Sequence, residues 1–502
     1  MVLKITRSQA GAASAVVMPT GSTPAEPVDE LQRRLDALVQ DFRSEPATPQ
    51  RFLELEQALH AAATQMCRQV LEREANRLEP DDRRAVPAKV RYRKETYRIN
   101  KKTLAKIATR FGTIHVRSFY YLNEEDGEPG LHPLLVRLGI GAGSATPALL
   151  ERVARLAVDD TQSAARAWLL REHGLVWSNT RLRTALAGFR QALLPFRAAL
   201  QTQRLLSWLE QAQTSRGRHR PVLAVGRDGI MIPMRDGSYQ EASTATVSVY
   251  NRRRQRLGTI YLGQMPETKQ ATLSRTLTAV LTATLTAWHG PPPRLAYVTD
   301  KGSAPDDYYR RVLKKMKHPR DGRPLAWEWV LDFWHVCSYV GKMADALFGA
   351  ETTAGRQWFA KMRHWLRERR HGAAHVSRSA SQLLDRRKMT KAQKAEFWKA
   401  YRYLRRHRRW MDYQGHRRRG LPIGSGVTEA ACKTVFTQRF KRSGMRWHGE
   451  SGQVILDLRT MHLSGIWDQA FAADLAARPL PFSAAYQGSH NAGQQLALNI
   501  AA

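Results

Sequence analysis

The chain has 502 residues, of which 43% are hydrophobic. It is therefore too long for one ordinary core, which predicts two to four domains, and too apolar to be disordered throughout. Lys and Arg total 80 against 44 Asp and Glu, a formal net charge of +36. This balance favours a polyanionic partner, with nucleic acid first because each neutralised phosphate releases counterions, and with a merely basic surface or acidic lipid as alternatives.

The hydrophobic and cysteine patterns of the sequence indicate a cellular compartment and the state of the cysteines. No apolar run approaches the roughly 20 residues that span a bilayer, and the N-terminus shows no apolar stretch of the secretory type. The sequence therefore predicts a cytoplasmic, nucleoid-associated protein with no membrane partner. Cys67, Cys337 and Cys432 lie far apart, which favours three small core residues over a disulfide framework or a zinc site.

The first part of the chain divides into three segments. Residues 1–28 are rich in Ala, Ser, Thr and Pro, which predicts a disordered lead-in. Residues 29–84 carry apolar residues at helical spacing, and Pro46 and Pro49 divide them into two helices. Residues 85–215 are interpreted as a mostly helical DNA-binding region, in which β-branched and aromatic residues at 113–121 indicate a strand or hairpin.

A candidate helix-turn-helix lies within that region. The segment SAARAWLLREHGLVWSNTRLRTALAGF predicts a helix, a turn at Gly174 and a second helix opened by Ser178 or Asn179. An ordinary helical hairpin has the same pattern, so both interpretations stay open.

Residues 216–470 change to alternating strands and helices. Strands are predicted at PVLAVGRDG, TATVSVYN, LGTIYLGQ, RLAYVTD and WEWVLDFWHV, with helices at 267–288 and 304–317. The predicted class is α/β, with a mixed sheet whose order β-β-β-α-β-α-β is that of ribonuclease-H-like folds. The tail at 471–502 is rich in Ala, Gln and Gly, which predicts disorder.

A basic helical insertion is predicted at about 338–420. From position 356 to position 419 there are 21 Lys or Arg and 4 Asp or Glu, a difference of +17, with Trp and Tyr interleaved. One interpretation is a helical insertion with a solvated charged face. We favour a subdomain that grips DNA, because so strong a field of one sign destabilises a fold unless a polyanion answers it.

Acidic residues at strand ends are conspicuous in so basic a chain. Asp228 follows the first strand and Asp300 ends the fourth, and each could be an ordinary turn residue. Ligands in α/β sheets bind at the carboxyl ends of strands, so the two carboxylates converge if these strands are neighbours. Phosphoryl transfer between DNA strands uses two divalent ions held by a few such oxygens.

Three further acidic or imidazole side chains are candidates. Asp332 and His335 lie three residues apart in LDFWHV; they face opposite sides of a strand but stack if a helix begins there. Glu429 follows a Gly-Ser-Gly loop at the start of an apolar helix. It could be an acid that the helix dipole favours near the N-terminus, or a metal ligand. The residues after it that suit DNA binding are Lys433, Arg439, Lys441, Arg442, Arg446 and Trp447.

Taken together, these segments resemble the DDE transposases of bacterial insertion sequences, in the ISKra-type group, distantly similar to Mutator-like transposases. The resemblance rests on VGRDG, VTDKG, LDFWHV and GLPIGSGVTEAACKTVFTQRFKRSGMRW, and it covers roughly residues 85–470. It implies a ribonuclease-H-like core in which Asp228, Asp300 and Glu429 bind two Mg²⁺ or Mn²⁺ ions, with Asp332 and His335 as an accessory pair.

The resemblance also implies an activity and partners. The enzyme would cut and join double-stranded DNA at the terminal inverted repeats of an insertion sequence and in target DNA, acting as a homo-oligomer. Two alternatives remain: a non-catalytic, domesticated DNA-binding protein, and a ribonuclease-H-like nuclease that cleaves without joining.

Overall fold

In a computed structural model of the chain, the residues described are 27–92, 95–125, 128–141, 143–384 and 386–477. The lead-in predicted at 1–28 lies outside them except for its last two residues, as does the predicted tail from 478 onward. The tail prediction is wrong for residues 471–477, which continue helix α17 (Trp467–Ala477). Phe471 packs against Phe189 there, with 5.8 Å between ring centroids, so this turn is held by aromatic contact.

The N-terminal segment combines a helical pair with a small sheet. Its elements are α1 (Pro27–Arg43), α2 (Pro49–Arg77), η1 (Arg83–Ala85), β1 (Lys89–Tyr92), β2 (Glu95–Thr109) and β3 (Gly112–Asn123). The two helices divided by prolines are confirmed, and Thr48 caps α2 by accepting the Arg51 N–H at 3.3 Å. The hairpin expected at 113–121 is longer than predicted, because β2 and β3 pair along almost their whole length and β1 adds a third antiparallel strand.

The helical hairpin expected around Gly174 is present. The helices of this part are α3 (Pro133–Arg137), α4 (Pro147–Asp159), α5 (Gln162–His173) and α6 (Asn179–Thr214). Gly174 ends α5 in the left-handed region at φ 62°, which glycine adopts without strain. Ser178 then caps α6, accepting the Arg181 N–H at 3.1 Å. Helix α6 has 36 residues, far more than a recognition helix alone needs.

A five-stranded mixed sheet follows in the described part of the chain. Its strands are β4 (Val222–Pro233), β5 (Tyr239–Tyr250), β6 (Arg256–Gln264), β7 (Arg294–Thr299) and β8 (Trp327–Leu331), in the spatial order β6-β5-β4-β7-β8. The first three are antiparallel, whereas β4, β7 and β8 run parallel. The expected order of strands and helices along the chain is confirmed. The fifth strand is shorter than predicted, because Asp332 ends it and caps the next helix.

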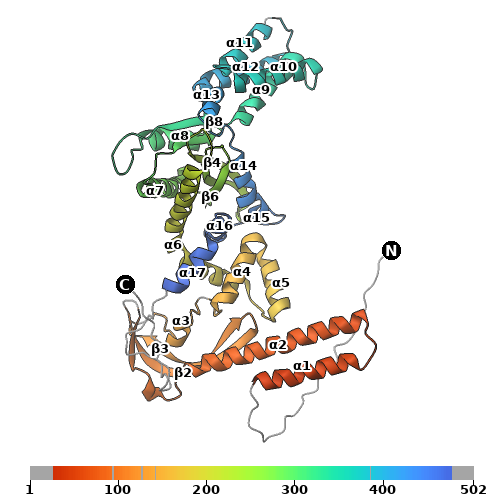
Figure 1. The fold of residues 1–502 in the computed structure, drawn as a ribbon, viewed down its shortest axis with the longest axis vertical. Helices are drawn as coiled ribbons and strands as arrows, with labels where there is room; N and C mark the ends of the chain where they lie inside the picture. Colours follow the sequence, from red (N-terminus) through yellow and green to blue (C-terminus); the bar gives the residue numbers. More distant parts are fainter. Residues whose placement is uncertain (1–26, 93–94, 126–127, 142, 385, 478–502) are drawn as a thin grey trace.

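Helices cover both faces of this sheet (Figure 1). The connecting helices are η2 (Thr268–Gln270), α7 (Ala271–Ala287), α8 (Ser303–Arg311), η3 (Leu313–Lys315) and α9 (Phe333–Phe348). Leu223 and Val225 of β4 pack with α6 and α7 on one face. Val222 and Ala224, which alternate with them along the strand, pack with α9 on the other. Near-continuous burial of these strands follows from cover on both sides.

The basic insertion is helical and extends from one end of the sheet (Figure 1). Its elements are α10 (Thr353–Glu368), α11 (Gly372–Leu384), α12 (Lys391–His407), η4 (Arg408–Trp410) and α13 (Tyr413–Arg418). The predicted start at 338 falls inside α9, since that helix begins at Phe333 against the sheet and shares one apolar cluster with α10, α11 and α12. The inserted helices therefore share a hydrophobic core with one face of the sheet.

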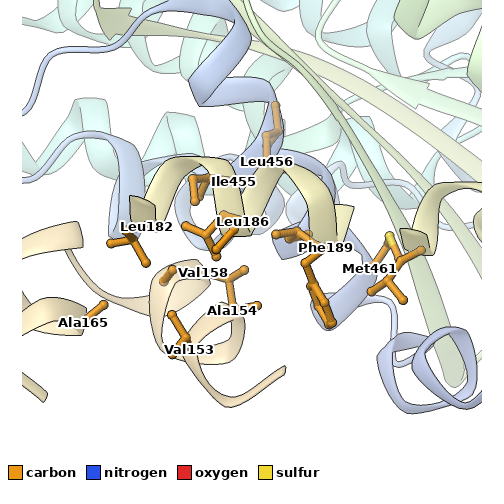
Figure 2. Close-up of a cluster of buried hydrophobic side chains, with 14 of the residues drawn as sticks. Val153, Ala154, Val158, Ala165, Leu182, Leu186, Phe189, Ile455, Leu456 and Met461 are labelled. Atoms are coloured by element: carbon orange, nitrogen blue, oxygen red, sulfur yellow. The ribbon is translucent and has the colours of Figure 1, made fainter. Parts of the chain in front are cut away.

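The chain then returns to the sheet through α14 (Gly426–Ala431), the π-helix η5 (Cys432–Thr437), α15 (Gln438–Phe440), α16 (Gly449–Leu463) and α17. Figure 2 shows Ile455 and Leu456 of α16 beside Leu186 and Phe189 of α6 and Val153 of α4. One core thus joins the helical hairpin to the last helices of the chain. Among the described residues, none of the helices combines the length and the apolarity needed to cross a lipid bilayer.

Candidate active site

Asp228 and Asp300 lie on neighbouring parallel strands. Gly226 of β4 pairs with Val298 of β7, the last pair between these strands, and Asp228 and Asp300 each follow that pair by two residues. Asp300 follows the last residue of β7, as predicted. Asp228 does not end its strand, because β4 continues to Pro233 in its pairing with β5. The parallel pairing ends beside it, so the two acids share the carboxyl edge of β4 and β7.

Glu429 is brought to this edge by a close approach of helix and strand. Gly226 leaves no room for a side chain, since a Cβ there would lie 1.9 Å from the Thr428 hydroxyl oxygen of α14. That hydroxyl lies 2.8 Å from the Thr246 hydroxyl of β5. One helical turn later the Cys432 thiol donates to Asp228 Oδ2 at 3.2 Å. The start of α14 is therefore fixed on the strand that carries Asp228.

The charges of Asp300 and Glu429 act on the Asp228 carboxylate. Burial raises the pKa of Asp228, and the negative charges of Asp300 and Glu429 raise it further, against opposing hydrogen bonds from the Cys432 thiol and the Gly229 N–H. Burial and the adjacent Asp228 raise the pKa of the Cys432 thiol, which is therefore a neutral donor. A site that concentrates negative charge in this way favours a bound cation.

The donor set suits a hard divalent ion, because it offers three carboxylates and Mg²⁺ prefers oxygen ligands. All three carboxylates are partly engaged within the protein: Asp228 accepts from Cys432, Asp300 accepts from the Gly302 N–H, and Glu429 Oε1 lies 2.7 Å from the Ser425 hydroxyl. In the part of the chain that the structure describes, no three His, Cys, Asp or Glu side chains form an assembled metal-binding group. The acids are neighbours rather than a closed ligand shell.

Asp332, predicted as an accessory residue, is hydrogen-bonded within the protein beside Glu429. Its carboxylate is fully buried. One oxygen caps α9 by accepting the His335 N–H, and the other accepts the Ser425 N–H at 2.5 Å and lies 2.9 Å from the Ser425 hydroxyl. Ser425 therefore stands between Asp332 and Glu429, and Asp332 holds the loop that leads into α14.

His335 lies one turn into α9 and is partly buried. Its ring meets the edges of Tyr339 and Tyr403 at centroid distances of 5.4 and 6.0 Å. The alternative in which a helix begins at Asp332 is thus the observed one, with the Asp332 carboxylate bonded to the backbone of His335 and the imidazole turned toward two tyrosines.

The predicted DNA-binding residues divide by exposure. Lys433, Lys441 and Arg446 are exposed. Arg442 is also exposed but is paired with Asp160 and donates to the Asp159 carbonyl, so it ties α15 to the end of α4.

Arg439 and Trp447 correct the prediction. Arg439 is buried, donates to the Ala157 carbonyl at 3.0 Å and lies over the Trp447 ring. Burial lowers the pKa of Arg439 to about 10. Trp447 is buried as well and donates to the Phe440 carbonyl at 2.9 Å. Both side chains stabilise the segment after η5, and neither lies on a surface that DNA could reach.

Two side chains near the acids were missed in the sequence. Cys432 contacts Asp228, which its place one turn after Glu429 on an apolar helix could have indicated. Trp334 is 60% exposed, and a Cβ at Gly424 would lie 3.3 Å from its ring. A tryptophan directly after a buried strand in LDFWHV is expected inside, so its exposure beside the loop into α14 was not foreseen.

Comparison with known proteins adds no family assignment. No protein-family model matches the chain, and no similar curated protein was found.

Proposed function

We propose that this protein is a DNA transposase that cleaves and joins DNA strands by metal-dependent phosphoryl transfer. The observation that carries the proposal is the meeting of three acids from distant parts of the chain. Asp228, Asp300 and Glu429 gather at one edge of the sheet, close enough for Asp300 and Glu429 to raise the pKa of Asp228. They do so within a chain of net charge +36.

The fold supports the same proposal. Three antiparallel strands followed by two parallel ones, with helices on both faces, agree with the element order of ribonuclease-H-like folds. The four segments that carry the resemblance to insertion-sequence transposases, VGRDG, VTDKG, LDFWHV and GLPIGSGVTEA, lie together around the acids. We infer that the sheet is a ribonuclease-H-like catalytic core and that α10–α13 form its insertion.

In the proposed mechanism, Asp228, Asp300 and Glu429 would hold the metal ions. Two Mg²⁺ or Mn²⁺ ions, when bound, would supply Lewis-acid activation of water or a DNA 3′-hydroxyl and would stabilise the leaving 3′ oxygen. The protein itself positions the groups: Asp332 fixes the loop before α14, and Thr428 fixes the helix on β4 and β5. Ser425 can donate its single hydroxyl proton to Glu429 or to Asp332, which orients the Glu429 carboxylate.

Double-stranded DNA, both terminal inverted repeats and target, is the proposed partner. Lys433, Lys441 and Arg446 are exposed and could neutralise phosphates: Lys433 directly follows Cys432, and Lys441 and Arg446 lie by the turn between β4 and β5. The basic face of α10–α13 would hold DNA further from the cleavage point, and α5 with the start of α6 would read the repeats. Bringing two DNA ends together implies a homo-oligomer on DNA.

The proposal is tested with a labelled oligonucleotide that carries the element end. Asp228→Asn, Asp300→Asn and Glu429→Gln should each reduce strand cleavage and joining by several orders of magnitude while DNA binding stays within about threefold, because the acids act on the reacting phosphate rather than on affinity. The matched control is Asp236→Asn, in an exposed Asp-Gly turn between β4 and β5 where the carboxylate accepts from Ser238 and Gln240. Robust joining by any of the three site variants with Mg²⁺ would refute the assignment.

A non-catalytic DNA-binding protein is the second candidate, because Asp228 and Glu429 are each hydrogen-bonded within the protein and form no assembled metal group among the described residues. Calorimetric titration of Mn²⁺ into wild type and Asp300→Asn separates the two. Heat that disappears in the variant supports the enzyme, and equal traces support the binder. The oligonucleotide assay also identifies a nuclease without joining activity, since joined products are longer than the substrate.

A further inference from the structure

Lys301, the residue directly after Asp300, has an unusual backbone and an unusual side-chain environment. Its φ is 73°, in the left-handed region that residues with a Cβ rarely adopt. This turn lets the Gly302 N–H donate to Asp300 Oδ1 at 3.2 Å. The conformation of Lys301 therefore sets the direction of the Asp300 carboxylate.

The Lys301 side chain is enclosed rather than offered to solvent. It is 6% exposed and pairs with Asp306 of α8. Its ammonium lies over two tryptophan rings, 4.2 Å from the centroid of Trp329 and 4.6 Å from that of Trp410. A lysine beside acids in a DNA-binding protein is expected to contact phosphate, but this one is inside an aromatic cage, where cation–π attraction is strong because water is excluded.

The cage joins the turn to two separate parts of the fold. Trp329 belongs to β8, and its indole N–H donates to the Thr299 hydroxyl at 3.0 Å, directly before Asp300. Trp410 belongs to η4, at the end of the longest helix of the insertion. The same insertion supplies Tyr403, whose hydroxyl donates to the Asp300 carbonyl at 3.3 Å and whose ring stacks on Tyr339 at 3.9 Å.

We propose that Lys301 is a positioning residue: its cage of Trp329, Trp410 and Asp306 holds the turn that aims Asp300, and so makes the helical insertion a structural part of the catalytic edge. The left-handed turn is not self-supporting in a lysine, and the caged ammonium provides the contact that keeps it in place. This inference rests on the proposed function for its catalytic consequence, but the geometry of the turn can be tested without it.

The experiment compares variants of the full chain in two measurements. Lys301→Met keeps the aliphatic stem and removes the charge, and Trp410→Leu removes one wall of the cage from the side of the insertion. Trp410→Phe keeps an aromatic face and serves as the conservative rescue. The control is Lys314→Met, an exposed lysine of η3. The first measurement is the DNA cleavage rate together with the dissociation constant for DNA, and the second is amide hydrogen exchange in peptides that cover 299–306.

Lys301→Met and Trp410→Leu should slow cleavage by about tenfold or more, as expected when a reacting group is misplaced. Their dissociation constants for DNA should stay within twofold, and exchange at 299–306 should be faster. Trp410→Phe and Lys314→Met should match wild type in both measurements. Thermal unfolding of each variant identifies any variant that has lost its fold. If either Lys301→Met or Trp410→Leu is unfolded, the one that remains folded decides the outcome.

Other results overturn the proposal. Wild-type cleavage and wild-type exchange in a folded Lys301→Met would show that the cage positions nothing. Weaker DNA binding with unchanged exchange would show instead that Lys301 contacts phosphate. If the wild-type protein cleaves no DNA, the proposed function is refuted, but the positioning role of Lys301 can still be tested. Faster hydrogen exchange at 299–306 in the cage variants would support that role, and unchanged exchange would reject it.

Discussion

Replacing Gly226 with alanine should separate the Glu429 helix from the strand that carries Asp228. An added Cβ would lie 1.9 Å from Thr428 Oγ1 and 3.0 Å from Thr428 Cβ, whereas ordinary contact begins at 3.4 Å, so the hydroxyl must retreat by about 1.5 Å and the Cβ by a few tenths of an ångström. Thr428 is bonded to Thr246 of β5, so the retreat also strains or breaks that bond. Overpacking of this kind costs about 1–3 kcal/mol in stability, and a 1 Å displacement of a reacting group costs about 10²-fold in rate.

The assay is the cleavage rate of a labelled DNA end, with thermal unfolding measured on the same preparations. Gly449→Ala is the matched control, because Gly449 opens α16 and a Cβ there has no atom within 4 Å. The control should cleave and unfold like wild type. Wild-type cleavage by a folded Gly226→Ala would refute the reasoning, since it would mean that the seating of α14 on β4 does not set the position of Glu429.

Three further predictions concern charged side chains. Asp228→Asn should raise the unfolding midpoint near pH 8 in the absence of divalent ions, by a few degrees at most. The raised pKa of Asp228 means that the folded protein loses stability as this carboxyl ionises with rising pH, so the gain should shrink toward pH 4; a gain that grows on acidification would contradict this sign. Arg439→Met should lower stability by about 1–3 kcal/mol by removing a buried donor and leave the salt dependence of DNA binding unchanged. Lys441→Ala should do the reverse, reducing the slope of log affinity against log salt by about 1; equal salt slopes for Lys441→Ala and wild type would argue against a phosphate contact.

The sequence was sufficient to predict the order of strands and helices in the mixed sheet of residues 222–331. Alternating and continuous apolar runs identified each strand, and Pro49, Gly174 and Ser178 marked helix ends through backbone chemistry that is local to them. Asp228 and Asp300 could be placed together because parallel neighbours bring the carboxyl ends of their strands to one edge. These features depend on contacts between residues that are close in sequence or on general rules of sheet topology.

The errors concern side chains whose role depends on distant partners. Arg439 and Arg446 both look like phosphate ligands in a basic segment, but only the fold shows that Arg439 is covered by Trp447 and the end of α4. Asp332 was predicted as an accessory residue from its spacing to His335, but its hydrogen bonds to Ser425, 93 residues away in the chain, could not be read from that spacing. Lys301 was not singled out at all, since its cage is made by residues 28 and 109 positions downstream.

Helix α6 has a mechanical consequence. It starts at the turn after Gly174 and continues through 36 residues, with Pro195 inside it, to pack on the sheet that carries the acids. At about 1.5 Å per residue it is about 54 Å long. A single rod of this length fixes the spacing between whatever its first turn touches and the acidic edge. If the first turn of α6 reads DNA, the helix sets the distance between the recognised bases and the cleavage site. Base pairs inserted between the recognition sequence and the cleavage site should then change which phosphate is cleaved, while the distance from the recognised bases to the cut stays the same.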